Sequence, residues 1–173
     1  MILVKISSPG PIFFRQKRTG EGNREFYCWK FRTMRVNSDS DNKQASANDK
    51  RITSIGKFLR KTNLDEMPQF FNVLFGNMSV VGPRPHLWSQ NKAYGNKIKK
   101  YMVRHYVKPG ITGLAQVKGF RGEIESEQDM INRIKFDVFY IDNWSLILDI
   151  KIIVQTVINI IKGEKKGLLK LYK

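Results

Sequence analysis

The stretch Glu25-Phe26-Tyr27-Cys28-Trp29-Lys30-Phe31-Arg32-Thr33-Met34 alternates between two kinds of side chain, as a β-strand does. A period of two puts the cations Lys30 and Arg32 on one face and leaves aromatic side chains on the other. Upstream, Ile12-Phe13-Phe14-Arg15-Gln16 predicts a second strand, and the glycine-bearing segment 19–23 joins the two. The sequence therefore predicts an antiparallel β-hairpin, whose two cations either hold phosphate or lie at a solvated strand end.

Helices are predicted downstream of the hairpin. Segment 52–61 has apolar residues at helical spacing, and so does segment 131–141, which carries Asp137 at the edge of its apolar stripe. Segment 144–161 is rich in Ile, Leu and Val but contains charged and amide side chains, which is typical of an amphipathic helix and not of a membrane span. We therefore expect an α+β fold, a small hairpin packed among several helices, some of them interfacial. Residues 1–173 form one domain.

Residues 64–74 predict a further helix after a break at Thr62-Asn63. Proline is tolerated only in the first turn of a helix, so Pro68 places Asp65 and Glu66 at the N-terminus of this helix. Adjacent carboxylates at such a position are usually helix-start charges favoured by the macrodipole. A carboxylate can also attack phosphorus and split a transfer reaction into two steps. The residues alone leave both interpretations open.

The charge balance indicates an anionic partner. Lys and Arg total 31 against 15 acids, which gives a net charge of +16. Nucleic acid, an acidic membrane surface and phosphorylated substrates would all fit this excess. Many of the cations gather in segment 92–108, interleaved with tyrosines, and in the tail from Lys162. These lysines either attract anionic lipid or lie on a solvated face.

Several kinds of site are disfavoured by the composition. Cys28 is the only cysteine, so an internal disulfide is excluded, and its position in a strand indicates a buried, inert thiol. His86 and His105 lack metal-ligand spacing with Cys28, which argues against a zinc site. Asp39-Ser40-Asp41 mimics the Asp-x-Asp metal motif of sugar-nucleotide enzymes, but such a pattern arises easily by chance in a polar loop.

Seven short motifs occur along the chain in this order: Ser8-Pro9-Gly10-Pro11, Phe14-Arg15-Gln16, Lys30-Phe31-Arg32-Thr33-Met34, Leu64-Asp65-Glu66-Met67-Pro68-Gln69, Val81-Gly82-Pro83-Arg84-Pro85, Pro109-Gly110-Ile111-Thr112-Gly113 and Asn143-Trp144-Ser145. Together they resemble the bacterial sugar transferases, the monotopic phosphoglycosyl transferases, and the resemblance covers essentially the whole chain. Each motif alone is weak. Seven in the same order are hard to obtain by chance.

The resemblance implies a two-step reaction at the acidic pair. In this family the Asp attacks the β-phosphate of a UDP-sugar, releases UMP, and leaves a phosphosugar on the enzyme. Polyprenyl (undecaprenyl) phosphate then takes the phosphosugar, and Mg²⁺ is required. Carried onto this sequence, Asp65 is the nucleophile and Glu66 its partner, and both are expected to bind the metal. A metal also makes physical sense, because diphosphate facing two carboxylates would otherwise be repelled.

The resemblance also implies a set of substrate-binding residues, which are Lys30, Arg60, Pro83, Arg84, Pro85, Arg121 and Asp137. Arg121 lies in Gly119-Phe120-Arg121-Gly122-Glu123, where many small members have Gly-Arg-Asn. This segment looks more like that of members that begin exopolysaccharides with glucose or galactose phosphate. Family members start the domain with a re-entrant membrane helix, of which we expect only the last residues here.

The partners expected are thus a UDP-sugar, polyprenyl phosphate and an anionic membrane surface, at the cytoplasmic face of a bacterial inner membrane. Homo-oligomer formation is left open, and nucleic acid is not expected as a partner. The main alternative is a basic nucleic-acid-binding module, which the charge and the aromatic residues among cations suggest. No helix-turn-helix or RNP-like pattern supports that alternative. A catalytically silent membrane scaffold is a third interpretation.

Overall fold

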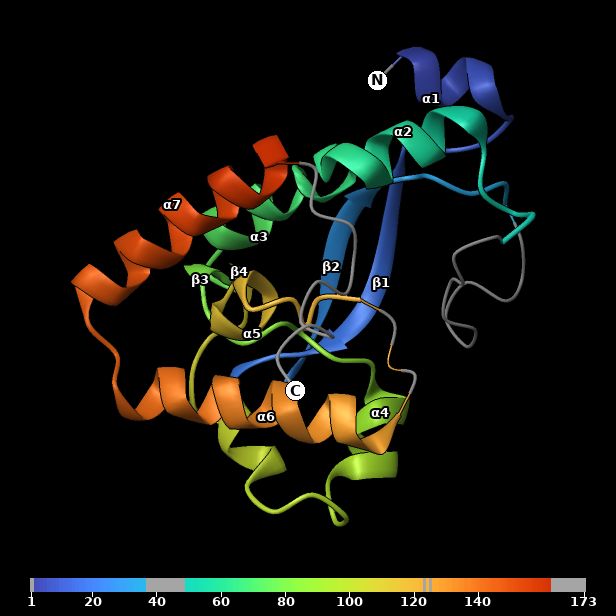
Figure 1. Cartoon of the computed structure of the whole chain (residues 1–173). Helices are drawn as coiled ribbons and strands as arrows, with labels where there is room; N and C mark the ends of the chain where they lie inside the picture. The colour runs from blue at the N-terminus through green and yellow to red at the C-terminus, as the bar shows by residue number, and fades with distance from the viewer. Residues whose placement is uncertain (1, 37–48, 123, 125, 163–173) are drawn as a thin grey trace.

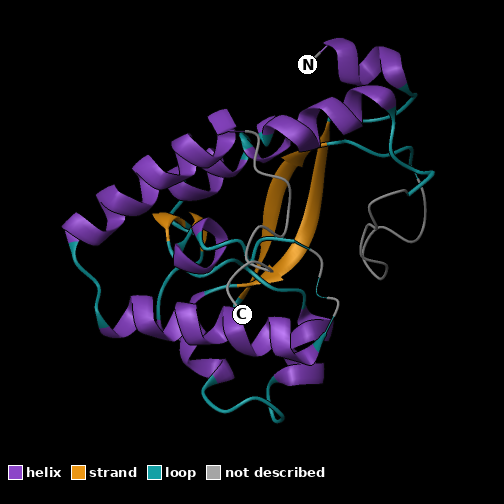
Figure 2. Cartoon of the chain, viewed as in Figure 1, coloured by secondary structure: helices purple, strands orange, loops and turns teal. Residues whose placement is uncertain are grey.

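The predicted hairpin is present at the centre of the molecule. The computed structural model describes residues 2–36, 49–122, 124 and 126–162. Strands β1 (Phe13–Thr19) and β2 (Glu25–Phe31) pair antiparallel, and helices surround them (Figures 1 and 2). Strand β1 runs three residues further than predicted, and β2 ends at Phe31 and not at Met34. The α+β class is confirmed. The motif Asp39-Ser40-Asp41 lies outside the described residues.

A side chain from a helix covers one edge of the hairpin. Asn72 belongs to α3 (Gln69–Leu74) and is 1% exposed. Its Oδ1 accepts a hydrogen bond from the main-chain N–H of Trp29 at 2.9 Å, and its Nδ2 donates to the main-chain oxygen of Tyr27 at 2.8 Å. The amide thus satisfies the strand edge as a neighbouring strand would. This contact fixes α3 against β2.

The two acidic residues lie in a tight turn and not, as predicted, at the start of an α-helix. Helix α2 (Ser54–Thr62) ends at Asn63, whose left-handed φ of 60° stops it. The 3-10 turn η2 (Leu64–Glu66) follows, and α3 begins only after Pro68. Main-chain N–H groups of Glu66 and Met67 donate to residues three positions earlier, which is the 3-10 pattern. The prediction started the helix about one turn too early in the sequence, because Pro68 precedes the α-helix and does not lie within it.

A second, short sheet is present that the sequence did not predict. Strands β3 (Ser79–Val81) and β4 (Gly110–Thr112) pair parallel. At this sheet the two backbones lie so close together that a Cβ on Gly110, the first residue of β4, would overlap the main-chain nitrogen of Gly82. Glycine is therefore required there to bring the segment 82–85 against the segment 108–110.

Most of the remaining helices pack into two apolar clusters. Their bounds are α1 (Ile2–Ser7), η1 (Glu21–Asn23), α4 (Trp88–Tyr94), η3 (Tyr101–Tyr106), α5 (Leu114–Val117), α6 (Glu127–Asp142) and α7 (Leu146–Lys162). Helix α6 packs Ile134 and Val138 with Tyr101 in one cluster, which confirms the predicted apolar stripe. The second cluster joins α5, α6 and α7 to β3 around Val81 and Ile152.

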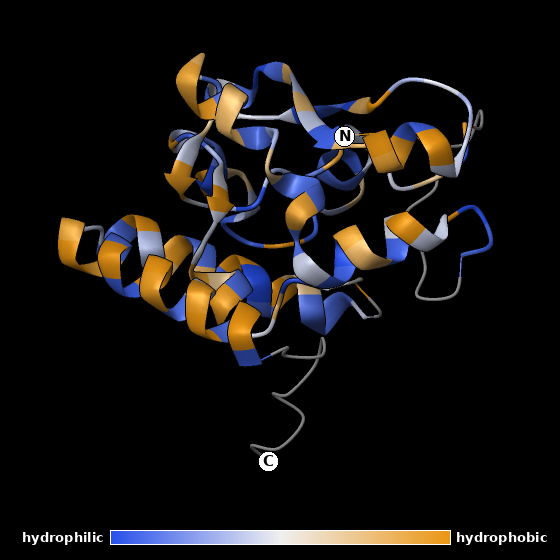
Figure 3. Cartoon of the chain, turned by 90° about the horizontal axis from the view of Figure 1, so that it is seen from above, coloured by the Kyte–Doolittle hydropathy of each residue, from blue (hydrophilic) through white to orange (hydrophobic). Residues whose placement is uncertain are grey.

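Much of the surface of α7 is apolar. Ile152 is buried, whereas large hydrophobic side chains are exposed along the rest of the helix, among them Leu146, Ile147, Ile150, Val154, Val157 and Ile161. Helices α1, α2 and α3 also expose large hydrophobic side chains, among them Ile2, Phe58, Phe71 and Leu74. These four helices lie along the upper side in Figure 1, and Figure 3 views that side. Among the described residues, no helix is long and apolar enough to cross a membrane.

The basic segment 92–108 lies elsewhere. Figure 1 shows the chain from α4 to η3 at the end of the molecule opposite α1, α2 and α7. In addition, Arg104 is buried and therefore cannot belong to a solvated basic face. The chain from α4 to η3 thus cannot contact the same flat bilayer as α1, α2 and α7.

Candidate active site

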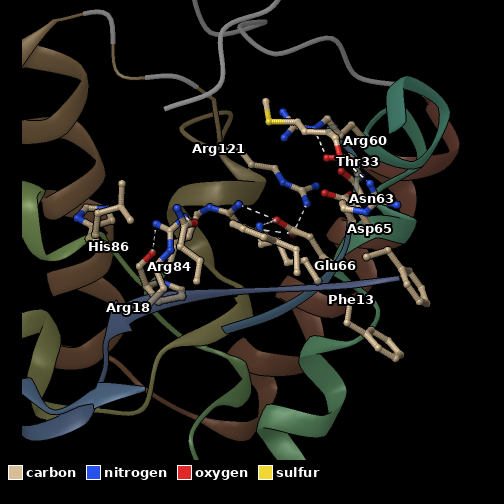
Figure 4. Close-up of a pocket in the computed structure, with 18 of the residues that line it drawn as sticks. Phe13, Arg18, Thr33, Arg60, Asn63, Asp65, Glu66, Arg84, His86 and Arg121 are labelled. Carbon is tan, nitrogen blue, oxygen red and sulfur yellow. Dashed lines mark hydrogen bonds and ion pairs between the residues drawn. The ribbon is translucent and has the colours of Figure 1, made fainter. Parts of the chain in front are cut away.

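A cavity of about 350 Å³ lies against the hairpin (Figure 4). Two carboxylates line it, Asp65 and Glu66. Among the described residues its basic side chains are Arg18, Lys30, Arg32, Arg35, Arg60, Arg84, Arg121 and Arg133. Eight cations against two acids make the cavity strongly electropositive, so it suits a ligand with several negative charges.

Glu66 binds three of these cations. Its carboxylate meets Lys30 Nζ at 2.9 Å, Arg84 Nη2 at 2.7 Å and Arg121 Nη2 at 2.7 Å. The partners come from β2, from the turn after β3 and from the loop after α5, so one carboxylate joins three segments distant in sequence (Figure 4). Burial alone would raise the pKa of Glu66, but the three cations hold it well below its usual value. Glu66 is therefore ionised.

Asp65 differs from its neighbour. Within the described part of the chain, its carboxylate makes no hydrogen bond or ion pair, although only 9% of the residue is exposed. Burial, and then the charge of Glu66, raise the pKa of Asp65, while Lys30 and Arg60 oppose the shift. A carboxylate without a hydrogen-bond donor keeps its lone pairs available. Asp65 thus has the environment that a nucleophile needs.

Arg60 lies on the far side of Asp65 from the Glu66 cluster (Figure 4). Its Nε donates to Thr33 Oγ1 at 2.8 Å, which fixes the side chain along the cavity wall. Burial lowers the pKa of Arg60, and the charge of Asp65 opposes that effect. The predicted cations Lys30, Arg60, Arg84 and Arg121 are all brought together around the acidic pair.

The turn 83–85 is held by all three of its carbonyl groups. The oxygen of Pro83 accepts from the main-chain N–H of Gly110 at 2.9 Å. The oxygens of Arg84 and Pro85 accept from Arg104 Nη2 at 2.6 Å and Arg18 Nη1 at 3.3 Å. Pro85 lines the cavity, whereas Pro83 does not in the described part of the chain. The turn therefore serves as a rigid mount for the Arg84 side chain.

Asp137 lies behind this turn and not in the described wall of the cavity. It is 2% exposed, and its carboxylate pairs with Arg104 Nη2 at 2.9 Å. Arg104 is the same side chain that binds the carbonyl of Arg84. The structure thus connects Asp137 to the site through Arg104, so any contact with substrate would have to be indirect.

Arg32 does not behave as a phosphate ligand. Its guanidinium donates to the main-chain oxygens of Ser8, Pro9 and Pro11 and to Ser8 Oγ, at 2.6–2.9 Å. These bonds tie the segment after α1 to the hairpin. Of the two cations on that strand face, Lys30 therefore reaches the acidic pair and Arg32 is structural. Cys28 is 1% exposed and burial raises the pKa of its thiol, as expected for an inert cysteine.

The chain matches the bacterial sugar transferase family over residues 1–163. It belongs to that family. One relative is a UDP-glucose:undecaprenyl-phosphate glucose-1-phosphate transferase of Xanthomonas campestris, 58% identical over 94% of this chain and 34% of its own length. A protein of the same name from Escherichia coli is 52% identical over 90% of this chain and 34% of its own length. This sugar transferase chain spans about a third of the length of those relatives.

A third relative carries a different sugar in its name. The UDP-N-acetylgalactosamine-undecaprenyl-phosphate N-acetylgalactosaminephosphotransferase of Aeromonas hydrophila is 45% identical over 94% of this chain and 38% of its own length. Family membership explains the seven motifs together. It favours the transferase interpretation over a nucleic-acid-binding module.

Two arginines that matter to the sugar transferase site were missed by sequence reasoning. Arg104 was counted with the basic segment, and Arg133 of α6 was not singled out, although it lines the cavity and is 5% exposed. Both stand in charged, amphipathic patterns that are typical of solvated helix faces. The local signal available for Arg133 was its place four residues before Asp137, one turn along the same helix.

Proposed function

We propose that this sugar transferase moves a sugar phosphate from a UDP-sugar to polyprenyl phosphate through a covalent intermediate on Asp65. The observation that supports it is the contrast between the acidic neighbours. Glu66 holds three cations in place, while Asp65 has no hydrogen-bond partner in the described part of the chain. The names of the relatives, which give UDP-sugars and undecaprenyl phosphate, supply the substrate classes.

In the proposed first step, a carboxylate oxygen of Asp65 attacks the β-phosphorus of the UDP-sugar. The bond from that phosphorus to the bridging oxygen breaks, and UMP leaves with the electron pair. An oxygen of polyprenyl phosphate then attacks the same phosphorus, and the carboxylate of Asp65 is released. In each step one anhydride P–O bond forms as another breaks: first the acyl phosphate on Asp65 replaces the diphosphate of the UDP-sugar, and then the lipid diphosphate replaces the acyl phosphate. No reductant or oxidant is therefore needed.

The cations around Glu66 would neutralise the diphosphate. Arg84 presents a planar fork that matches a phosphate bidentately, and Lys30 supplies a point charge. Glu66 keeps these groups assembled before substrate arrives, so little reorganisation is needed when phosphate oxygens join them. Arg60, beside Asp65, is placed to stabilise charge on the phosphosugar.

The residues present fit the expected Mg²⁺. Magnesium is usually held by one or two carboxylates together with substrate phosphates, and the Asp65 carboxylate has unused oxygen lone pairs. Among the described residues no cluster of three or more His, Cys, Asp or Glu is present. Asp65 would be the first protein ligand, and the adjacent carboxylate of Glu66 would be the second, because its oxygens have a lone pair left beside their three short contacts with cations. The bound metal would supply further neutralisation of the diphosphate.

We further propose that the exposed apolar side of α1, α2, α3 and α7 lies in the surface of the bacterial inner membrane, on its cytoplasmic face. Large aliphatic and aromatic side chains are exposed on all four helices, which is more than isolated surface residues would give. An acceptor with a polyprenyl chain requires such a location. Glucose is the first sugar to test, since relatives 58% and 52% identical name it.

An exchange assay tests the proposal directly. The protein in lipid vesicles is given UDP-glucose and radiolabelled UMP without polyprenyl phosphate. A covalent intermediate predicts that label appears in UDP-glucose, since the first step reverses on its own. A panel of other UDP-sugars then ranks the donors. If no UDP-sugar exchanges label, and none releases UMP when polyprenyl phosphate is added, the proposed function is wrong.

A further inference from the structure

Three arginines in and around the cavity are almost fully buried, and they differ in what compensates their charge. Arg32, 6% exposed, donates to four oxygen acceptors at 2.6–2.9 Å. Arg104, 3% exposed, pairs with the carboxylate of Asp137. Among the described residues, Arg133, 5% exposed, makes a single hydrogen bond, from Nη2 to the main-chain oxygen of Gly122 at 2.9 Å. Its Nε, which solvent does not reach, has no partner in the described part of the chain.

Within the part of the chain that the structure describes, Arg133 is therefore a buried cation without an anion of its own. The acid whose charge most stabilises protonated Arg133 is Asp137, and that carboxylate is already paired with Arg104 at 2.9 Å. Burial, and then the charges of Arg84 and Arg104, lower the pKa of Arg133 to about 10. A buried guanidinium normally comes with a carboxylate or a phosphate, because an uncompensated charge is costly in the protein interior.

The position of Arg133 shows where the missing anion would lie. The side chain belongs to the wall of the cavity that also holds Arg84 and the acidic pair. Arg84 donates to Glu66 through Nη1 and Nη2 and lines the same cavity as Arg133. Its positive charge therefore also acts on an anion bound there. An anion between Arg84 and Arg133 would remove the repulsion between the two guanidiniums and satisfy both.

We propose that Arg133 forms a second phosphate-binding position in this cavity, distinct from the cluster around Glu66. The inference rests on the proposed function, which brings two phosphate-containing substrates to the site. Two sources share the chemistry: the α-phosphate of the UDP-sugar, which leaves in UMP, and the phosphate of the polyprenyl acceptor. When the β-phosphate of the UDP-sugar lies at Asp65, its α-phosphate extends away from the nucleophile and is one candidate for the Arg133 position. The acceptor phosphate attacks the same phosphorus and is the other candidate.

Binding of UMP and of uridine, measured by calorimetry, tests this without turnover. Uridine lacks the phosphate, so the ratio of the two affinities reports the phosphate contact alone. For Arg133→Gln we expect the affinity for UMP to fall about tenfold while that for uridine is unchanged. Arg133→Lys, which keeps the charge but not the fork, should lose less. A parallel measurement of the KM for a short polyprenyl phosphate identifies the acceptor as the source if it rises about tenfold while the UMP affinity is kept.

Arg32→Gln is the matched control. It removes an equally buried arginine of the same cavity, whose three guanidinium nitrogens all donate to protein oxygens. It should lower the melting temperature and leave the ratio of UMP to uridine affinity unchanged. An equal loss of UMP and uridine binding in Arg133→Gln would show a structural role and overturn the proposal, as would no loss for UMP, uridine or the acceptor. Absence of UMP binding by the parent protein would instead count against the proposed function.

Discussion

The guanidinium of Arg104 donates a hydrogen bond to the main-chain oxygen of Arg84, 2.6 Å away. The same nitrogen binds Asp137 Oδ2 at 2.9 Å, so a buried ion pair stands directly behind the turn that carries an active-site arginine. The ion pair bridges η3 and α6, which also share an apolar cluster. The position of the Arg84 side chain thus depends on packing in a part of the molecule that lies away from the cavity.

Replacing Asp137 with Asn should destabilise the protein by about 3–5 kcal/mol, because Arg104 would be left as a buried charge without a counter-ion. Thermal or urea unfolding measures this. The double change Arg104→Met with Asp137→Leu replaces the pair by apolar groups and should recover most of that stability. The kcat/KM of the double variant for the UDP-sugar should nevertheless be lower than that of the parent, since the carbonyl of Arg84 loses its hydrogen-bond donor. Recovery of both quantities together would show that the pair has no positioning role.

Asp65→Asn should slow the exchange of UMP into the UDP-sugar at least about a thousandfold, which corresponds to roughly 4 kcal/mol in activation free energy. The amide is isosteric and much less nucleophilic. Because burial and Glu66 raise the pKa of Asp65, its charge is unfavourable in the folded state. The variant should therefore melt at the same temperature as the parent or slightly higher. Exchange at near the parent rate would remove Asp65 as nucleophile, and a large loss of stability would make the activity result uninformative about chemistry.

Local sequence patterns predicted only part of the fold. The alternation in 25–34 and the turn residues before it are local signals, so the hairpin could be predicted. The pairing of β3 with β4 joins three-residue strands about thirty residues apart, and no periodicity marks strands so short. The acidic pair was found from its motif, but its 3-10 turn depends on the left-handed Asn63.

Local sequence patterns also do not predict which charged side chains pair with each other. Arg104 and Asp137 stand 33 positions apart, and only the packing of α6 against η3 brings them together. Lysines and arginines look alike in a basic sequence, whether they end at solvent or in the interior. The buried roles of Arg104 and Arg133 follow from tertiary structure alone.

Glu66→Gln should lower stability by about 3–5 kcal/mol at neutral pH, because three cations lose a buried carboxylate. Since the pKa of Glu66 is depressed in the folded protein, its contribution is fully present above its ordinary value of 4.5. It is lost as pH falls through the folded-state pKa. The difference in stability between parent and variant should therefore be constant above about pH 5 and shrink on acidification. Urea unfolding from pH 3 to 7 measures it, and a difference that grows toward low pH would contradict the assignment.

Arg84→Lys should reduce kcat/KM for the UDP-sugar at least tenfold, about 1.4 kcal/mol or more. The lysine keeps the charge near Glu66, but it cannot present two parallel donors to a phosphate. Arg15→Lys is a suitable control. Arg15 is an exposed arginine whose guanidinium lies over the rings of Tyr27 and Trp29, and its replacement should leave kcat/KM unchanged. Equal values for parent and Arg84→Lys would leave Arg84 as a partner of Glu66 only.

Vesicle binding separates the two regions that the sequence associates with a membrane. Ile147, Ile150 and Val154 of α7 expose more than half of their surface, so changing all three to Gln should not disturb the core. Each side chain placed in the bilayer surface contributes on the order of 1 kcal/mol or more, so the triple variant should bind vesicles at least tenfold more weakly. The parent should retain part of its binding at 0.15 M salt, where the Debye length is about 8 Å, because the apolar contribution is not screened.

The matched control is the triple change of Lys97, Lys99 and Lys100 to Gln. These lysines lie between α4 and η3, at the end of the molecule opposite α1, α2 and α7 (Figure 1). If the apolar side faces the lipid, the lysines face away from it, and this variant should sediment with vesicles as the parent does. Loss of binding in the lysine variant, with none in the α7 variant, would mean that the basic end contacts the bilayer. In that case α7 would have to be covered by another part of the protein.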